Sequence, residues 1–201
     1  MPMRLAVCVS GRGSNLLALL DALAPDRQAE VVLVLSNRPN APALERARER
    51  GITAVSLTDY RDSAEWLARL ESARVDLVVL AGYLKLVPAP VIAAYRGRIV
   101  NIHPALLPDF GGPGMFGRHV HEAVLQSGAP VSGATVHLVD EQYDRGAILA
   151  QARVPVLPGD TPETLAARVL RAEHALLPAV IRKAAETGRL VPLSEPMELP
   201  A

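Results

Sequence analysis

Short apolar runs recur along the chain and are separated by stretches in which apolar residues have helical spacing. The runs predict seven strands, at 5–9, 31–35, 52–57, 75–80, 98–102, 131–139 and 148–156. Several are apolar throughout, which is typical of strands buried on both faces in a parallel sheet. Strands that alternate with helices predict βαβ units, so the expected class is α/β.

The helical stretches are expected to begin at Leu16 and to cover 43–50, 62–73, 118–127 and a long segment that ends near Thr187, with a bend at Pro178. Asp160 is expected to cap the long helix, with Glu163 three residues later in a capping box. Trp66 lies at helical spacing with leucines, which favours a place in the core. The tail from Arg189 is expected to be coil.

Composition narrows the possible functions. Half of the 201 residues are apolar, and the formal net charge is zero, with a pI near 7. This balance argues against a nucleic-acid partner or a membrane surface. No apolar stretch approaches the roughly 20 residues of a membrane span, and no signal peptide is evident. The single cysteine, Cys8, lies in an apolar run and fits a reducing compartment.

The motif Asn101-Ile102-His103-Pro104 offers the clearest candidate chemistry. In an extended chain, residues two apart face the same side, so the amide of Asn101 and the imidazole of His103 project together. Proline ends the strand, which places both side chains at the carboxyl end, where open α/β sheets bind ligands. Alone, the pair also fits a hydrogen-bonded asparagine and a packed histidine.

A glycine-rich turn follows the first strand, at Ser10-Gly-Arg-Gly13-Ser14-Asn15. Its backbone N–H groups would lie at a helix start, which favours an anion, and Ser14 and Asn15 could cap the helix or donate to a phosphate. The turn matches neither the dinucleotide fingerprint nor a Walker loop. His119 and His121 lie two apart, the wrong spacing for one helix face, so no metal site is expected there.

Taken together, four signals resemble the phosphoribosylglycinamide formyltransferase family over about residues 4–190. They are the Gly-Ser-Asn turn, Asn101-x-His103-Pro with Leu106-Leu-Pro108, Asp144 before Gly146, and Arg168 with Glu173-His174. The resemblance implies a three-layer α/β/α sandwich with a mostly parallel seven-stranded sheet. It also implies one domain over 1–201, with a Rossmann-like nucleotide-binding half (1–100), a catalytic and folate half (101–190) and a tail (191–201).

The resemblance implies formyl transfer from 10-formyltetrahydrofolate, as cosubstrate, to the amine of glycinamide ribonucleotide in purine synthesis. Asn101 and a protonated His103 would donate to the formyl oxygen, and Asp144 would keep the imidazole charged and relay protons. Substrates would be small molecules, with no metal, nucleic acid or membrane, in a cytoplasmic monomer or homodimer. The binding residues implied are Gly13, Ser14, Asn15 and Glu173 for the ribonucleotide, and Leu84, Lys85, Leu86, Val87, Asn101, Val139 and Asp140 for the folate.

Three departures from the family pattern stand out. Lys85 replaces a frequent arginine and lacks its bidentate fork. A basic residue often found at the position of Leu170 is missing, and Arg168 or Arg171 could substitute for it. The glycine-rich segment 110–117 is longer than expected. We expect it either to close over the substrates as a lid or to be pinned to the core by its apolar side chains.

Other functions remain open at this point. A formyltetrahydrofolate deformylase would use water in place of the amine, but that family normally carries an extra N-terminal domain, and this chain starts at its first strand. A methionyl-tRNA formyltransferase would need a further C-terminal domain and a basic face. A non-catalytic folate- or nucleotide-binding protein would have no need of Asn101, His103 and Asp144 together.

Overall fold

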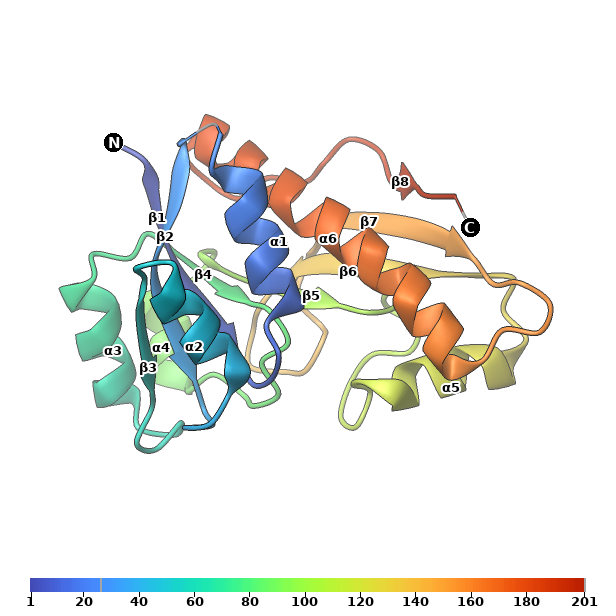
Figure 1. Ribbon diagram of the computed structural model, residues 1–201, viewed down its shortest axis with the longest axis horizontal. Coiled ribbons are helices and arrows are strands. Elements are labelled where there is room, and N and C mark those ends of the chain that lie inside the picture. Colours follow the sequence, from blue (N-terminus) through green and yellow to red (C-terminus); the bar gives the residue numbers. More distant parts are fainter. Residues whose placement is uncertain (26, 201) are drawn as a thin grey trace.

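The computed structural model describes residues 1–25 and 27–200 and has an eight-stranded sheet with helices on both faces (Figure 1). The strands are β1 (Met3–Val9), β2 (Ala29–Ser36), β3 (Thr53–Ser56), β4 (Leu77–Leu80), β5 (Ile99–His103), β6 (Val131–Leu138), β7 (Ile148–Pro155) and β8 (Met197–Glu198). The helices are α1 (Ser14–Leu23), α2 (Pro42–Glu49), α3 (Ser63–Ser72), α4 (Ala89–Ala94), α5 (Arg118–Ser127) and α6 (Pro162–Thr187).

The sheet has the order β3-β2-β1-β4-β5-β6-β7-β8, and of these strands β6 alone runs antiparallel to its neighbours. The first five strands are all parallel, whereas β6 pairs antiparallel with both β5 and β7. The chain order reverses at β1, which lies between β2 and β4. This topological switch point is where open α/β sheets hold ligands.

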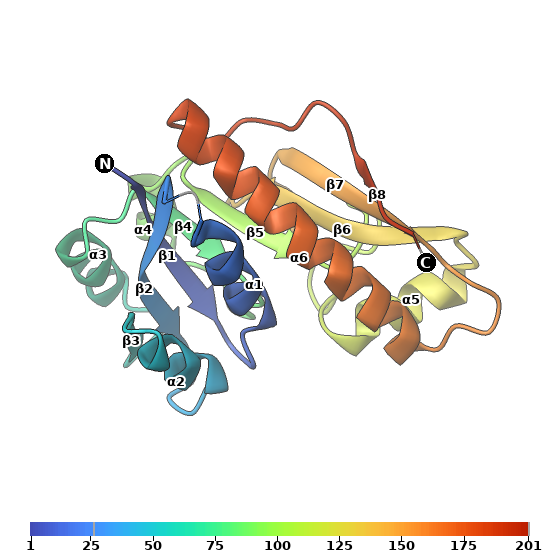
Figure 2. The same cartoon turned by 45° about the horizontal axis from the view of Figure 1, so that its top comes forward.

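Two apolar layers enclose the sheet, as the three-layer prediction requires. Leu5, Val7 and Val9 of β1 face a core that includes α1, α2, α5 and α6. Ala6 and Cys8, which alternate with them, face a smaller core built from α3 and α4. Figure 2 shows α6 crossing one face diagonally. The smaller core reaches from β2 across β1 and β4 to Ile99 of β5 and, among the described residues, includes none from β6 or β7.

The seven-strand prediction was one strand short. Strand β8 pairs parallel with β7 through Met197 and Glu198, and the tail is also held by Leu193 N–H, which donates to the Leu149 carbonyl at 2.8 Å. A two-residue strand that carries a glutamate has no apolar run to reveal it. The expectation of a coil is wrong for these two residues. The tail's last residue, 201, lies outside the described residues.

Two local predictions at helix ends were also wrong. Thr161, rather than Asp160, caps α6, and it forms its capping box with Thr164 instead of Glu163. The Asp160 carboxylate instead forms an ion pair with Arg168. Ser14 and Asn15 do not cap α1, because Gly13 holds the N-cap position in a left-handed conformation, with φ at 77°. A Cβ atom on Gly13 would meet the Ala43 Cβ at 2.6 Å, so this turn requires glycine on both counts.

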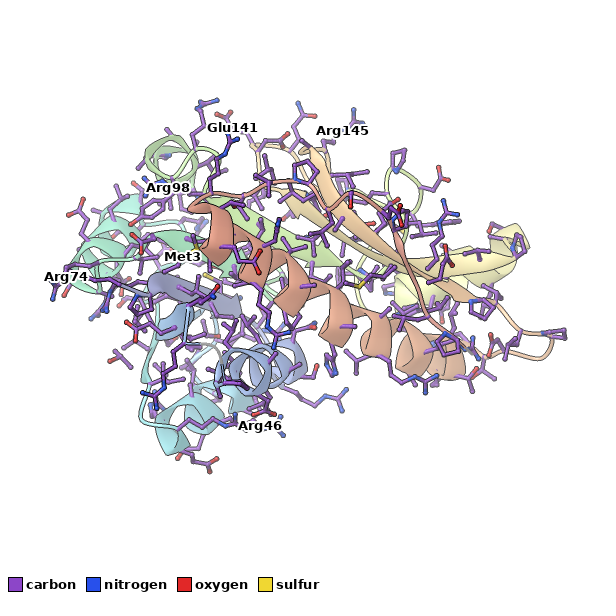
Figure 3. All side chains as sticks on the ribbon, turned by 90° about the horizontal axis from the view of Figure 1, so that it is seen from above. Met3, Arg46, Arg74, Arg98, Glu141 and Arg145 are labelled. Atoms are coloured by element: carbon purple, nitrogen blue, oxygen red, sulfur yellow. The ribbon has the colours of Figure 1, made fainter. Side chains whose placement is uncertain are left out.

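One helix was missed by the prediction, and one buried side chain was predicted correctly. Helix α4 was not predicted, because it has six residues and starts after Pro88 with a second proline inside its first turn. Trp66 is fully buried as expected, and its indole N–H donates to the Tyr60 carbonyl at 3.0 Å. Charged side chains such as Arg74, Glu141 and Arg145 project away from the ribbon (Figure 3).

Candidate functional site

A cavity of about 950 Å³ lies at the carboxyl ends of β1, β4 and β5. Its walls come from the glycine-rich turn and the start of α1, the segment after β4, the loop before α5, the loop after β6 and the first half of α6. The predicted site residues that line it are Ser14, Asn15, Leu84, Lys85, Leu86, Val87, Asn101, His103, Val139, Asp140, Asp144 and Glu173. Gly13 is not among the lining residues. The topology therefore brings residues from both halves of the sequence into one space.

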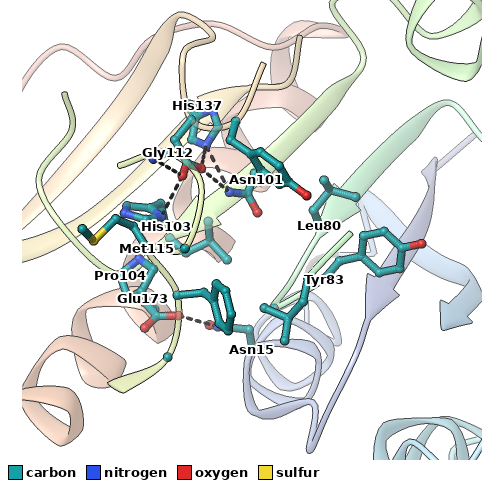
Figure 4. A pocket seen from close by; sticks show the side chains of 18 of the residues that line it. Asn15, Leu80, Tyr83, Asn101, His103, Pro104, Gly112, Met115, His137 and Glu173 are labelled. Carbon is teal, nitrogen blue, oxygen red and sulfur yellow. Dashed lines mark hydrogen bonds and ion pairs between the residues drawn. The ribbon is translucent and has the colours of Figure 1, made fainter. Parts of the chain in front are cut away.

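Four polar side chains form a cluster at one end of the cavity (Figure 4). Asn101 and His103 both project from β5, and Asn101 pairs across the strands with His137 of β6. The Asn101 amide nitrogen is 3.1 Å from His137 Nε2 and 3.5 Å from Asp144 Oδ1. The other carboxylate oxygen of Asp144 is 3.6 Å from His103 Nδ1. Asp144 thus lies between the two imidazoles.

His137 was not among the predicted site residues. Its Nδ1 is 2.8 Å from the Leu138 carbonyl, so this nitrogen must carry the proton that is donated. In the neutral ring Nε2 accepts from the Asn101 amide, whereas in the protonated ring Nε2–H faces the Asp144 carboxylate oxygen at 3.4 Å and can donate to it. The available signal was the alternation of Thr135 and His137 along β6, which placed both on the face that Asn101 and His103 share.

His103 is buried, with 3% of its surface exposed. Burial lowers the pKa of the imidazole, while the Asp144 carboxylate and the Phe110 carbonyl act to raise it and His137 to lower it. The net direction is down, which disfavours the protonated ring that was expected, although both ring nitrogens face acceptors, the Phe110 carbonyl and the Asp144 carboxylate. The neutral ring still donates, because its Nε2 lies 2.8 Å from the Phe110 carbonyl and must carry the proton.

Asp144 is held in a backbone conformation that few residues adopt. Its φ is 55°, in the left-handed region, and such positions store of order 1 kcal/mol of strain or more. Burial disfavours its charge, but the contact with His137, the neighbouring His103 and a 2.9 Å hydrogen bond from Gly112 N–H together keep the pKa of the carboxyl below its usual range. Asp144 is therefore ionised at neutral pH.

A second polar pair lies across the cavity and joins α1 to α6 (Figure 4). The Asn15 amide donates to Glu173 Oε2 at 2.6 Å, and both residues are buried. Burial raises the pKa of Glu173 to about 7, against the effect of the Asn15 hydrogen bond. A solvated helix carboxylate, the simpler alternative for this residue, is thus excluded.

The wall after β4 carries several apolar side chains beside Lys85. Leu84 and Leu86 are exposed at its rim, whereas Val87 is buried. The Ser10 hydroxyl accepts a 2.9 Å hydrogen bond from the Leu84 N–H, which fixes this segment to the end of β1. Tyr143 also lines the cavity and has an exposed aromatic ring. This wall can hold a flat, largely apolar group.

The loop from Phe110 to Gly117 divides into two parts. Phe110 packs against the main core, and its carbonyl accepts from His103, so the start of the loop is pinned. A Cβ atom on Gly111 would meet Leu107 at 2.5 Å and the Asp144 Cβ at 3.2 Å, which explains the glycine there. The later part carries Phe116, which is exposed and lines the cavity.

The alternative basic residue Arg168 and the two histidines of α5 have different surroundings in the structure. Arg168 does not replace a basic group at Leu170, because it forms a buried ion pair with Asp160 at 2.6 Å. Leu170 lines the cavity with an apolar side chain. His121 also lines it and is buried, while His119 is exposed, so the two histidines occupy different helix faces as their spacing predicted.

The described residues contain neither a metal-binding cluster nor a membrane-spanning helix. No group of three or more His, Cys, Asp or Glu side chains in 1–25 and 27–200 has an arrangement that could hold a metal ion. Within the same residues, none of the helices combines the length and apolar character required to cross a bilayer.

Comparison with known proteins gives a consistent result. The Formyl transferase family profile matches residues 3–181. The chain is 38% identical over 195 residues to the phosphoribosylglycinamide formyltransferase of Escherichia coli (strain K12), covering 94% of this chain and 89% of that one. It is 45% identical over 186 residues to the chloroplastic phosphoribosylglycinamide formyltransferase of Arabidopsis thaliana, covering 89% of this chain.

This chain spans only 64% of the Arabidopsis protein, and 14% of the trifunctional purine biosynthetic protein adenosine-3 of Drosophila melanogaster, to which it is 45% identical over 187 residues. Among solved structures, phosphoribosylglycinamide formyltransferase from Anaplasma phagocytophilum matches with a TM-score of 0.90 at 32% identity, and each chain is fully covered. A formyltetrahydrofolate deformylase from Pseudomonas syringae matches with a TM-score of 0.83 at 24% identity, which shows a shared fold alone.

Proposed function

The chain belongs to the formyl transferase family, and on that basis we propose that it transfers a formyl group from 10-formyltetrahydrofolate to the amine of glycinamide ribonucleotide. The products would be formylglycinamide ribonucleotide and tetrahydrofolate, in purine synthesis. The observation that carries the proposal is the cluster of Asn101, His103 and Asp144 in one cavity that is large enough for two substrates.

Acyl transfer develops negative charge on the formyl oxygen, and each prepositioned donor at that oxygen typically contributes about a hundredfold or more in rate. Asn101 NH₂ and His103 Nε2–H are the donors we assign. In the structure, the Phe110 carbonyl accepts the hydrogen bond from His103 Nε2–H. Substrate binding would then exchange this carbonyl for the formyl oxygen, which links the chemistry to the start of the 110–117 loop.

Proton movement falls to Asp144 and the two histidines. The attacking amine must lose a proton, and the departing folate nitrogen must gain one. Asp144 is ionised and lies 3.6 Å from His103 Nδ1 and 3.4 Å from His137 Nε2. As charge grows on the formyl oxygen, the carboxylate stabilises a positive charge on His103. The ring can therefore become protonated during the reaction although its pKa is lowered beforehand.

The substrates would enter from opposite walls. Gly13, Ser14 and Asn15 are assigned to the ribonucleotide phosphate, and Glu173 to its ribose hydroxyls or amine. The folate would lie against the segment 84–87, Asn101, Val139 and Asp140. On this division, residues 1–100 supply the phosphate-binding turn and residues 101–190 the chemistry. The proposal includes a cytoplasmic location, a monomer or homodimer and no metal cofactor.

Release of tetrahydrofolate with and without glycinamide ribonucleotide tests the function directly. Release that requires the nucleotide supports the transferase, whereas equal release without it supports the alternative, a deformylase. No release together with tight folate or nucleotide binding would indicate a non-catalytic binding protein.

The variant His103→Ala separates the proposed mechanism from simple binding. Loss of one oxyanion donor should lower kcat by about a hundredfold or more while the Kd for the nucleotide changes little. His119→Ala is the matched control, because this histidine is exposed and does not line the cavity. Near-normal turnover in folded His103→Ala would remove His103 from the mechanism.

A further inference from the structure

The proposed ribonucleotide carries a phosphate with close to two negative charges at neutral pH. The turn before α1 offers backbone N–H groups and the end of a helix dipole, but no full positive charge from Gly13, Ser14 or Asn15. The facing part of α6 offers no positive charge either: Ala166, Ala167 and Leu170 are apolar, and the other ionisable residues of this helix that line the cavity are acidic, Glu163 and Glu173. A cation must come from another position if the phosphate charge is to be balanced.

Three arginine or lysine residues among those described line the cavity: Arg12, Lys85 and Arg118. Lys85 lies over the Tyr60 ring, 5.2 Å from its centroid, beside the apolar wall. Arg118 is already bound to two carboxylates, those of Glu122 and Glu163. Lys85 is thus engaged with an aromatic ring, and the charge of Arg118 is neutralised by its two carboxylates.

Arg12 differs from these two in place and in partners. It immediately precedes Gly13, its side chain is exposed, and no carboxylate of the described residues forms an ion pair with it. Its backbone carbonyl accepts a 2.8 Å hydrogen bond from Arg46, which fixes the main chain of the turn. The guanidinium is therefore a free charge on an anchored backbone at the edge of the cavity.

A second observation indicates that a ligand belongs at this end of the cavity. Asn15 is buried, with 7% of its surface exposed, and lines the cavity three residues after Arg12. Its Nδ2 is used by Glu173, but its Oδ1 is buried without a hydrogen-bond partner among the described residues. A buried acceptor without a donor costs free energy, and a bound hydroxyl or amine would satisfy it.

We infer that Arg12 is the phosphate-binding cation of this site, taking the role that neither Leu170 nor Arg168 can fill. The guanidinium fork suits a phosphate, because it can donate two parallel hydrogen bonds to its oxygens. This inference rests on the proposed function for the identity of the ligand. It predicts that recognition of the phosphate depends on the second residue of the Gly-Arg-Gly turn.

The test compares Arg12→Ala, Arg12→Lys and the wild type with two ligands, glycinamide ribonucleotide and the corresponding nucleoside without its phosphate. Loss of a charged, bidentate contact should raise the nucleotide Kd by about tenfold or more. The nucleoside Kd and kcat at saturating nucleotide should stay near the wild-type values, and lysine should restore part of the affinity. Arg171→Ala is the control, because Arg171 is exposed on α6 and does not line the cavity.

An unchanged nucleotide Kd in Arg12→Ala, or equal losses for nucleotide and nucleoside, would overturn the assignment while leaving the proposed function intact. Titration with ribose 5-phosphate keeps the two questions separate. If the wild type shows no formyl transfer but binds this probe, and Arg12→Ala does not, then the proposed function fails and the phosphate site stands. If Arg12→Ala binds the probe as tightly as the wild type, the inference fails.

Discussion

Glu173 should make the stability of the protein depend on pH in a direction opposite to that of most carboxylates. Its pKa rises from 4.5 to about 7 on folding, chiefly because of burial. The native state thus holds the proton more tightly than the unfolded chain does. The associated stability is fully present below pH 4.5, falls as the pH rises and is lost above about pH 7.

The magnitude follows from the two pKa values. Each pH unit of difference is worth about 1.4 kcal/mol, so the carboxylate lowers the free energy of unfolding by about 3 kcal/mol above pH 7. Glu173→Gln keeps the shape and an acceptor for the Asn15 amide but cannot ionise. The variant should match the wild type at pH 4.5 and exceed it by about 3 kcal/mol at pH 8.

Urea unfolding followed by circular dichroism, at intervals from pH 4.5 to 8.5, measures this difference. Glu186→Gln is the matched control on the same helix, because Glu186 is exposed and paired only with Lys183. Its effect should stay within about 0.5 kcal/mol at every pH. Parallel stability curves for the wild type and Glu173→Gln would refute the raised pKa and, with it, the view of Glu173 as a buried acid.

Three further predictions concern a buried ion pair, a glycine of the sheet and the loop segment 112–117. Asp160→Ala should lower the free energy of unfolding by about 3–5 kcal/mol, since it leaves Arg168 as a buried, unpaired charge; a loss below about 1 kcal/mol would show that the pair is solvated. Gly133→Ala should cost about 3 kcal/mol or more, because its Cβ would lie 1.9 Å from a β7 carbonyl oxygen, whereas Gly11→Ala, which meets no atom within 4 Å, should not. Segment 112–117 should gain hydrogen-exchange protection when both substrate analogues bind, and equal protection without them would exclude a lid.

Much of the core and of the site could be predicted because it depends on local pattern. The alternation at Asn101 and His103 required only that β5 be extended, and the glycine turn required only a strand followed by a helix. Likewise, apolar runs marked seven strands, and they are most continuous in β1 and β4, which are largely buried on both faces. These features are written in neighbouring residues, so one sequence is sufficient to read them.

The features that could not be predicted depend on contacts between distant residues. His137 joins the cluster through its cross-strand register with Asn101, 36 positions earlier. Thr161 replaced Asp160 as the cap because Arg168 takes the Asp160 carboxylate. The pKa of His103 is lowered because the folded chain removes water from the ring, an effect that outweighs Asp144. Local alternation places His137 on one face of β6, but none of the contacts named here follows from local spacing alone.

The reversal of strand direction between β5 and β6 has a consequence for how such a site can arise. Two adjacent parallel strands need a crossover, usually a helix packed against the sheet, and such a helix on the Asn101 and His103 face of β5 would cover these side chains. The antiparallel return of β6 does not require a helix on that face and supplies His137 from the neighbouring strand. A nucleotide-binding sheet could thus acquire a catalytic cavity during evolution by the addition of one antiparallel strand. The ligand-binding edge that the sheet already had would be preserved.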